Sequence, residues 1–303
     1  MAPSSASDNV TRPLDAMAAA IVVVLCLSWG FNQVSVKLAI YDVPPLTQAA
    51  LRSVVATLLI AGWCRLRGIP MFGRDGTLWL GIAAGALFAA EFILIYQGLL
   101  YTTATRAVLF IYLAPFFVVL GARIVLPADR FGAAQWLGLS LSFAGMLIAF
   151  GVPTPALDPR QLIGDVMMVA AALFWAATTL LIKASALTRI SAEKVMLYQL
   201  VVSAPLMAIA AIFAGEHIDH MPSALALGAL AYQTVWVVSV TFVVWFALVA
   251  RYSANRLSAF TFLAPLFGVA AGHLVLGEPL TLAFAAAVAL VAGGLVLVNR
   301  PRR

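Results

Sequence analysis

The chain is a succession of long, continuously apolar stretches separated by short polar connections. Apolar runs of about 20 residues match the length of a helix that crosses a bilayer, whereas a membrane β-barrel would alternate apolar and polar positions. The pattern therefore predicts an all-α membrane protein with ten transmembrane helices. Their expected ranges are 16–38, 46–64, 77–100, 104–126, 133–151, 162–183, 193–214, 222–249, 254–276 and 281–299.

One apolar stretch occurs twice, at a constant offset of 150 positions. Residues 104–126 and 254–276 carry identical residues at many matched positions, including the mid-segment prolines Pro115 and Pro265. Each half holds five spans, and an odd number turns the second half over relative to the first. We therefore expect two inverted five-helix repeats. The expected boundaries are a disordered tail at 1–15, repeats at 16–151 and 161–299, a linker loop at 152–160 and a basic tail at 300–303.

Composition supports a membrane environment. Of the 303 residues, 64% are hydrophobic and 10% charged, against about 25% charged in soluble domains. Cys26 and Cys64 lie in or beside apolar segments and indicate neither a disulfide framework nor a metal site. The sequence contains no Gly-x-x-x-x-Gly-Lys-Ser/Thr loop, so we expect no nucleotide and no other cofactor.

Charge predicts the orientation. If the N-terminus is inside, fourteen Lys and Arg residues fall in cytoplasmic segments and three fall outside, which places both termini in the cytoplasm. The net charge of +6 sits in short loops, so we do not expect nucleic-acid binding. The outer connections are expected to carry acids instead: Asp42, Asp158, Asp165, Glu216, Asp219 and Glu278.

Glu91 is expected near the middle of the third span, where a charge costs roughly 3 kcal/mol on insertion scales. It should recognise a substrate amine, carry a proton, or form a structural ion pair, and Arg52 in the second span is the candidate partner. Arg52 could instead reach the outer interface. The repeat aligns Glu91 with Thr241 and Arg52 with Gln199, so neither charge is duplicated.

Trp29 and Trp175 are expected deep within equivalent spans, although Trp usually lies at the membrane interface. Facing tryptophans could hold an apolar side chain between them, and simple packing is the alternative. The other candidates for a substrate cavity are polar or aromatic side chains of spans one, three, four, six and eight: Asn32, Tyr96, Tyr112, Thr178, Gln233 and Trp245.

Pro115 and Pro265 each remove a backbone donor in mid-span. The carbonyl groups that they free, of Ile111 and Thr261, need another partner in lipid. We interpret the two prolines as hinges of a moving cavity, with fixed kinks as the alternative.

Several short segments together resemble one family. They are Ser-Trp-Gly-Phe-Asn at 28–32, Leu-Arg at 51–52, Leu-Ala-Pro at 113–115 and 263–265, and Gly-Glu-Pro-Leu at 277–280. The chain resembles the EamA type of the drug/metabolite transporter superfamily, and within it the bacterial exporters of aromatic amino acids. One departure is Pro-Ala-Asp-Arg at 127–130, where Gly-Glu-Pro is usual. The resemblance implies a bacterial inner-membrane protein with a central cavity between its halves, lined by spans one, three, four, six, eight and nine.

We therefore expect a secondary transporter that exports small neutral metabolites, above all amino acids with aromatic or other apolar side chains, by alternating access. Efflux of hydrophobic cations is the main alternative, since Glu91 and the tryptophans could bind a cation. A membrane-embedded enzyme would need clustered acids, histidine ligands or an activated nucleophile, and the sequence shows none of these within its spans. The expected partners are a small-molecule substrate and lipids, and the expected state is a monomer.

Overall fold

The computed structural model describes residues 14–73, 75–127, 129–153, 158–276 and 281–300, and these form ten helices long and apolar enough to span a membrane. This confirms the prediction of an all-α multi-pass membrane protein. The Gly-Glu-Pro-Leu segment at 277–280 and most of both predicted tails lie outside the described residues. Seven spans are single helices: α1 (Ala16–Ala39), α2 (Pro45–Leu66), α3 (Leu78–Gly98), α6 (Ala133–Phe150), α7 (Pro159–Ala184), α8 (Ala192–Phe213) and α13 (Leu282–Asn299).

The other three spans are interrupted. Span four divides into α4 (Ala104–Ile111) and α5 (Ala114–Val125), and span nine into α11 (Ala254–Phe260) and α12 (Leu263–Leu276). Both breaks come just before the predicted prolines. Span eight contains a π-helix, η2, between two α-helices, and the sequence pattern did not predict it. Its parts are α9 (Ala224–Ala231), η2 (Tyr232–Thr241) and α10 (Phe242–Arg251).

Side chains close the helix ends. Thr103 accepts a hydrogen bond from the Arg106 backbone N–H at the start of α4, and Ser253 does the same for Arg256 at the start of α11. The carboxylate of Glu216 accepts from the backbone N–H groups of Leu46 and Thr47 at the start of α2. A helix N-terminus favours such acceptors because its first N–H groups lack partners within the helix.

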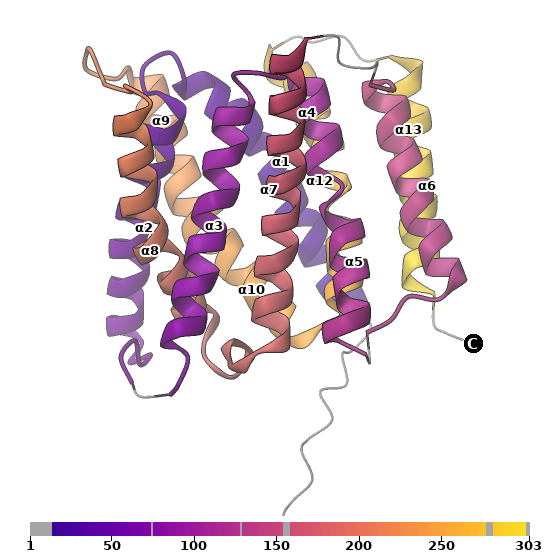
Figure 1. Cartoon of the computed structure of the whole chain (residues 1–303), viewed down its shortest axis with the longest axis horizontal. Coiled ribbons are helices and arrows are strands. Elements are labelled where there is room, and N and C mark those ends of the chain that lie inside the picture. The colour runs from indigo at the N-terminus through magenta and orange to yellow at the C-terminus, as the bar shows by residue number, and fades with distance from the viewer. Residues whose placement is uncertain (1–13, 74, 128, 154–157, 277–280, 301–303) are drawn as a thin grey trace, which may run out of the picture.

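The helices stand side by side as one bundle, with α6 and α13 paired at one end of it (Figure 1). Helix α2 packs on α8 and α6 on α13, so each of these helices contacts the span that the repeat predicts as its counterpart. The inverted relation of the two halves stays a prediction. Between α1 and α12 the backbones meet: a Cβ atom on Gly30 would lie 2.6 Å from the Ala264 carbonyl oxygen.

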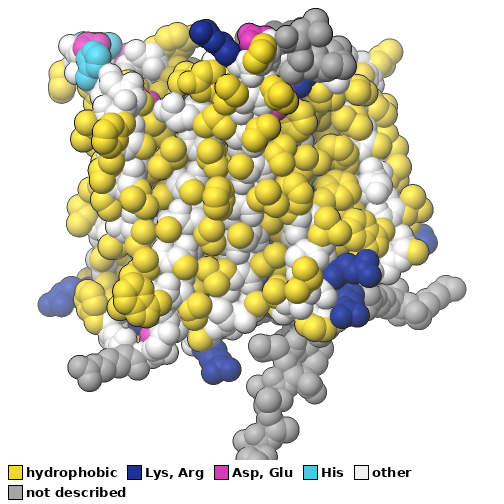
Figure 2. Space-filling model, in the orientation of Figure 1, with side chains coloured by type: hydrophobic (Ala, Val, Ile, Leu, Met, Phe, Trp, Pro, Cys, Tyr) yellow, Lys and Arg dark blue, Asp and Glu magenta, His cyan; other side chains and the backbone are white. Residues whose placement is uncertain are grey.

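The surface is an apolar band with charged edges (Figure 2). Most Lys and Arg side chains in this view lie along the lower edge, while acidic side chains and histidines gather at the upper edge. Helix α1 begins and α13 ends at the lower face (Figure 1). The two described ends therefore share one face of the bundle, as an even number of spans requires. The assignment of that face to the cytoplasm stays a prediction.

Candidate functional site

Three tryptophans and a phenylalanine form one aromatic cluster in the middle of the bundle. The ring centroid of Trp29 lies 6.5 Å from that of Trp175, 5.3 Å from that of Trp245 and 5.7 Å from that of Phe242. Trp175 and Trp245 are 6.2 Å apart. The cluster therefore joins α1 of the first predicted repeat to α7 and α10 of the second. Because Trp29 and Trp175 touch edge to face, no substrate fits between them in this conformation.

The π-helix fixes the position of Trp29. The indole Nε1–H of Trp29 donates to the Thr241 hydroxyl at 2.9 Å, and that hydroxyl donates to the Val237 carbonyl at 2.6 Å. Thr241 ends η2, so the geometry of the π-helix sets where the tryptophan is held. π-turns within α-helices are frequent at functional sites.

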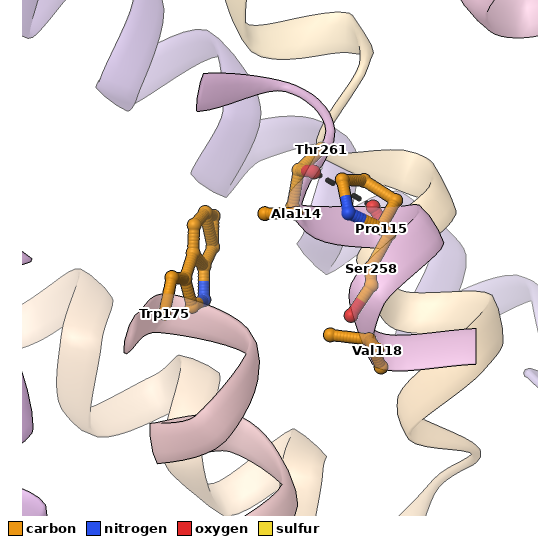
Figure 3. A pocket seen from close by; sticks show the side chains of 6 residues that line it. All are labelled: Ala114, Pro115, Val118, Trp175, Ser258 and Thr261. Carbon is orange, nitrogen blue, oxygen red and sulfur yellow. Dashed lines mark hydrogen bonds between the residues drawn. The ribbon is translucent and has the colours of Figure 1, made fainter. Parts of the chain in front are cut away.

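A small pocket lies beside the cluster at the level of the two helix breaks (Figure 3). It is lined by Ala114, Pro115, Val118, Trp175, Ser258 and Thr261, and the space between them is too small to hold a water molecule. Ligand pockets usually measure about 300–1,000 Å³. The central cavity between the halves therefore stays a prediction, and a substrate would require the halves to separate.

The helix breaks satisfy part of the backbone that the prolines free. In span nine, the Thr261 carbonyl accepts from the Ala264 backbone N–H at 2.9 Å. The Thr261 hydroxyl donates to the Ser258 carbonyl at 2.7 Å (Figure 3). The Cys26 thiol donates to the Phe260 carbonyl at 3.4 Å. The carbonyls of Ser258, Phe260 and Thr261 are therefore all paired at this break, whereas the buried Ser258 hydroxyl has no partner among the described residues.

Arg52 and Glu91 are both buried, with exposed fractions of 3% and 8%. No ion pair joins them among the described residues in this conformation, so their pairing stays a prediction, and the buried Arg52 does not reach the interface. Its guanidinium carbon lies 4.6 Å from the ring centroid of Phe92. The Arg52 Nε atom has no hydrogen-bond partner. The ring face of Phe92, and not the carboxyl group of Glu91, is therefore the immediate neighbour of the Arg52 guanidinium.

The remaining predicted cavity residues do not all converge on the cluster. Tyr96 packs on Phe92, and Tyr112 packs on Phe262, at centroid distances of 6.2 Å in both cases. Asn32, three residues after Trp29 in α1, has a buried side-chain oxygen without a partner. The other two are engaged elsewhere: the Thr178 hydroxyl donates to the Phe174 carbonyl at 2.9 Å, and Gln233 donates to Gln48 at 3.1 Å.

A set of three polar side chains connects the two halves at the upper face. The Arg106 Nε atom of α4 donates to an Asp165 carboxylate oxygen of α7 at 3.0 Å, and a terminal nitrogen of Arg106 completes the ion pair. The Thr102 hydroxyl donates to the same carboxylate at 2.6 Å. The sequence analysis placed Asp165 in an outer connection, which is wrong, because α7 begins at Pro159 and carries Asp165 into the bundle.

The corresponding positions at the lower face carry a related set. Tyr252 and Arg256 follow Thr102 and Arg106 by 150 positions. The Tyr252 hydroxyl donates to Asp15 at 2.7 Å, and Arg256 donates to the carbonyls of Asn299 and Arg300 at 3.3 Å. Asp15 precedes α1, the predicted equivalent of α7. Hydroxyl, arginine and aspartate therefore recur at both faces.

Comparison with known proteins identifies the family of this chain. A model of the EamA-like transporter family matches residues 16–151 and 162–300. The chain belongs to this family. The family lies within the drug/metabolite transporter superfamily, so the resemblance seen in the sequence is confirmed.

Relatives of this EamA protein match along nearly its whole length. An uncharacterized transporter, YvbV, of Bacillus subtilis is 25% identical over 93% of this chain and 91% of its own. A probable amino-acid metabolite efflux pump of Salmonella typhimurium is 26% identical over 92% of this chain and 93% of its own. A solved crystal structure has the same fold, with a TM-score of 0.80 at 19% identity over 93% of this chain and 96% of that one.

Sequence reasoning overlooked three parts of this EamA protein's candidate site. Phe88 and Phe242 extend the aromatic cluster, but an apolar residue in an apolar span gives no signal of its own. Asp165 was counted among the acids of the outer connections, although the predicted span 162–183 already contained it. No residue type marks the π-helix in the sequence. Within it, the Ser239 hydroxyl donates to the carbonyl of Thr234, five residues earlier in the chain.

Proposed function

We propose that this EamA transporter exports amino acids with aromatic or other apolar side chains across a bacterial inner membrane by alternating access. The observation that carries the proposal is the aromatic cluster of Trp29, Trp175, Trp245 and Phe242. Its side chains come from both predicted halves and can contact an apolar substrate when the halves separate. The family and the efflux pumps among its relatives support export of metabolites.

Alternating access is supported by the polar groups at the two faces. The upper one, Thr102, Arg106 and Asp165, holds α4 against α7. The related set at the lower face, Tyr252, Arg256 and Asp15, involves α11 and the start of α1. We take the two sets as the contacts that tighten and loosen in turn as the substrate path changes sides.

The orientation and the partners are part of the same proposal. Most of the Lys and Arg side chains in view lie at the face where α1 begins and α13 ends (Figure 2), so this face belongs in the cytoplasm. The protein then acts as a monomer in lipid on a small-molecule substrate, as a transporter and not as an enzyme.

Efflux of hydrophobic cations is a second candidate, which the burial of the Glu91 carboxyl group within α3 favours. Bacteria that overproduce the protein distinguish the two. We expect increased resistance to 4-fluorophenylalanine, a toxic amino acid, and unchanged resistance to ethidium, a toxic aromatic cation. Resistance to ethidium alone would favour the second candidate. Resistance to neither compound at verified membrane levels of protein would contradict both.

A further inference from the structure

Two ionisable side chains of opposite sign are buried without hydrogen-bonding or ionic partners in the part of the chain that the structure describes. Arg52 of α2 is 3% exposed and Glu91 of α3 is 8% exposed. Neither side chain forms a hydrogen bond or an ion pair with a described residue, and the Arg52 Nε atom is fully enclosed. A buried charge is costly unless it is paired and hydrogen-bonded. A ligand with charged groups of its own could therefore pair with both side chains.

The two charges lie in one neighbourhood. The Arg52 guanidinium covers the ring of Phe92, the residue that follows Glu91 in α3, at 4.6 Å. One molecule with two charged groups can consequently meet both side chains.

A row of aromatic rings leads from this pair to the tryptophan cluster. Phe92 lies 4.8 Å from Phe88, Phe88 lies 5.9 Å from Phe242, and Phe242 lies 5.7 Å from Trp29, measured between ring centroids. The two charges thus stand at one end of an apolar surface. A ligand suited to this surface has a charged end and an apolar body.

The charges are confined to the first half. Their counterparts under the repeat are Gln199 and Thr241, which are neutral. Gln199 donates to the Val195 carbonyl of its own helix, and Thr241 accepts from Trp29. The equivalent helices therefore pack without charges at these positions, so packing alone does not require Arg52 and Glu91.

We propose that Arg52 and Glu91 bind the two charged groups of a zwitterionic α-amino acid, with Arg52 on the carboxylate and Glu91 on the ammonium group. A guanidinium matches a carboxylate in a planar, bidentate arrangement, and an ammonium group has three donors for a carboxylate acceptor. The amino-acid side chain then lies along the aromatic row. A hydrophobic cation meets only Glu91 and leaves Arg52 unpaired. This inference rests on the proposed function and narrows its substrate class.

Calorimetric titration of the purified full-length protein tests the inference with three probes. The probes are L-phenylalanine, its methyl ester, which lacks the carboxylate, and 3-phenylpropanoate, which lacks the amine. We expect wild-type protein to bind phenylalanine about 30-fold or more tightly than either analogue, because each analogue leaves one buried charge unpaired. Equal affinity for all three probes would overturn the inference without any variant being needed.

The variants assign each charge to its group. Arg52→Gln should reduce phenylalanine binding to the level of the methyl ester while leaving the methyl ester unchanged. Glu91→Gln should reduce the affinity for phenylalanine to that for 3-phenylpropanoate. Arg52→Lys keeps the charge and should fall between Arg52→Gln and wild type. Arg65→Gln, the same change at an exposed position of α2, is the matched control, and gel filtration checks the fold of each variant.

The outcomes separate this inference from the proposed function. If wild-type protein binds phenylalanine but Arg52→Gln weakens all three probes equally, the assignment of Arg52 to the carboxylate is wrong and amino-acid transport stands. If wild-type protein binds none of a panel of apolar amino acids, both proposals fail.

Discussion

Arg106 of α4 and Asp165 of α7 form a buried ion pair that joins the two halves at the face opposite to the ends of the described chain. The side chains are only 10% and 6% exposed, and Thr102 adds a hydrogen bond to the same carboxylate. In a membrane bundle with apolar helix faces, such a contact fixes which helices meet and at what height.

Removing one partner of this pair should destabilise the protein. Arg106→Gln leaves the Asp165 charge buried, and breaking a buried pair in this way costs about 3–5 kcal/mol of the free energy of unfolding. The double variant Arg106→Gln/Asp165→Asn leaves no charge and should cost clearly less than the two single losses added together. Denaturant unfolding in detergent measures both. Strictly additive losses would show that the two side chains do not act as a pair. Arg160→Gln, at an exposed position of α7, is the control.

The prolines at the helix breaks should matter for transport rates more than for binding. Pro115→Ala or Pro265→Ala restores a backbone donor, so the broken span can continue as one helix and lose its flexible joint. A barrier raised by about 1.4 kcal/mol would lower the turnover rate tenfold, with the Kd for substrate unchanged. Pro205→Ala is the matched control, because α8 passes through Pro205 unbroken. An equal effect of all three changes on turnover would contradict the hinge interpretation.

The contact between α1 and α12 predicts a strong position effect for glycine. A Cβ atom at Gly30 would lie 2.6 Å from backbone atoms of Ala264 and Gly268, whereas one at Gly62 of α2 would meet nothing within 4 Å. Gly30→Ala should therefore destabilise by about 1–3 kcal/mol through overpacking. Gly62→Ala should be neutral or stabilise by up to about 1 kcal/mol through helix propensity. Thermal unfolding of the two variants compares them, and equal unfolding temperatures would refute close packing at Gly30.

Asp75 should make stability depend on acidity. A hydrogen bond from the Lys194 ammonium group, followed by those from Thr77, holds the pKa of the Asp75 carboxyl below its ordinary 3.8. A lowered pKa contributes stability in full above the ordinary value, and this contribution is lost as the pH falls through the lowered value. The unfolding temperatures of wild type and Asp75→Asn should therefore differ at pH 7, and this difference should shrink progressively as the pH falls below 3.8. A difference independent of pH would contradict this.

The sequence predicted the helices well because each span is a long apolar run bounded by turn residues. The predicted starts of α4 at Ala104 and of α6 at Ala133 are confirmed. The spans with Pro115 and Pro265 are interrupted just before these residues, and their role as hinges stays a prediction. Interior tryptophans were informative because Trp usually lies at the interface.

Side-chain pairing was much less predictable. Arg52 could reach the interface or pair with Glu91, and in the structure it lies on Phe92, which only the packing of α2 beside α3 brings about. The π-helix η2 was not predicted because no residue type in its sequence marks it. The contact between Trp29 and Trp175 depends on the rotation of two helices, which an almost uniformly apolar sequence does not specify.

The central claim is that apolar amino acids cross the membrane past the aromatic cluster. Counterflow of labelled L-phenylalanine into liposomes preloaded with unlabelled phenylalanine tests it most directly. The account predicts transient accumulation by wild-type protein, its loss in Trp29→Ala, and its retention in Trp63→Ala, a control in which the tryptophan is 51% exposed. Accumulation no greater than in protein-free liposomes, for phenylalanine and every other apolar amino acid, would contradict the claim.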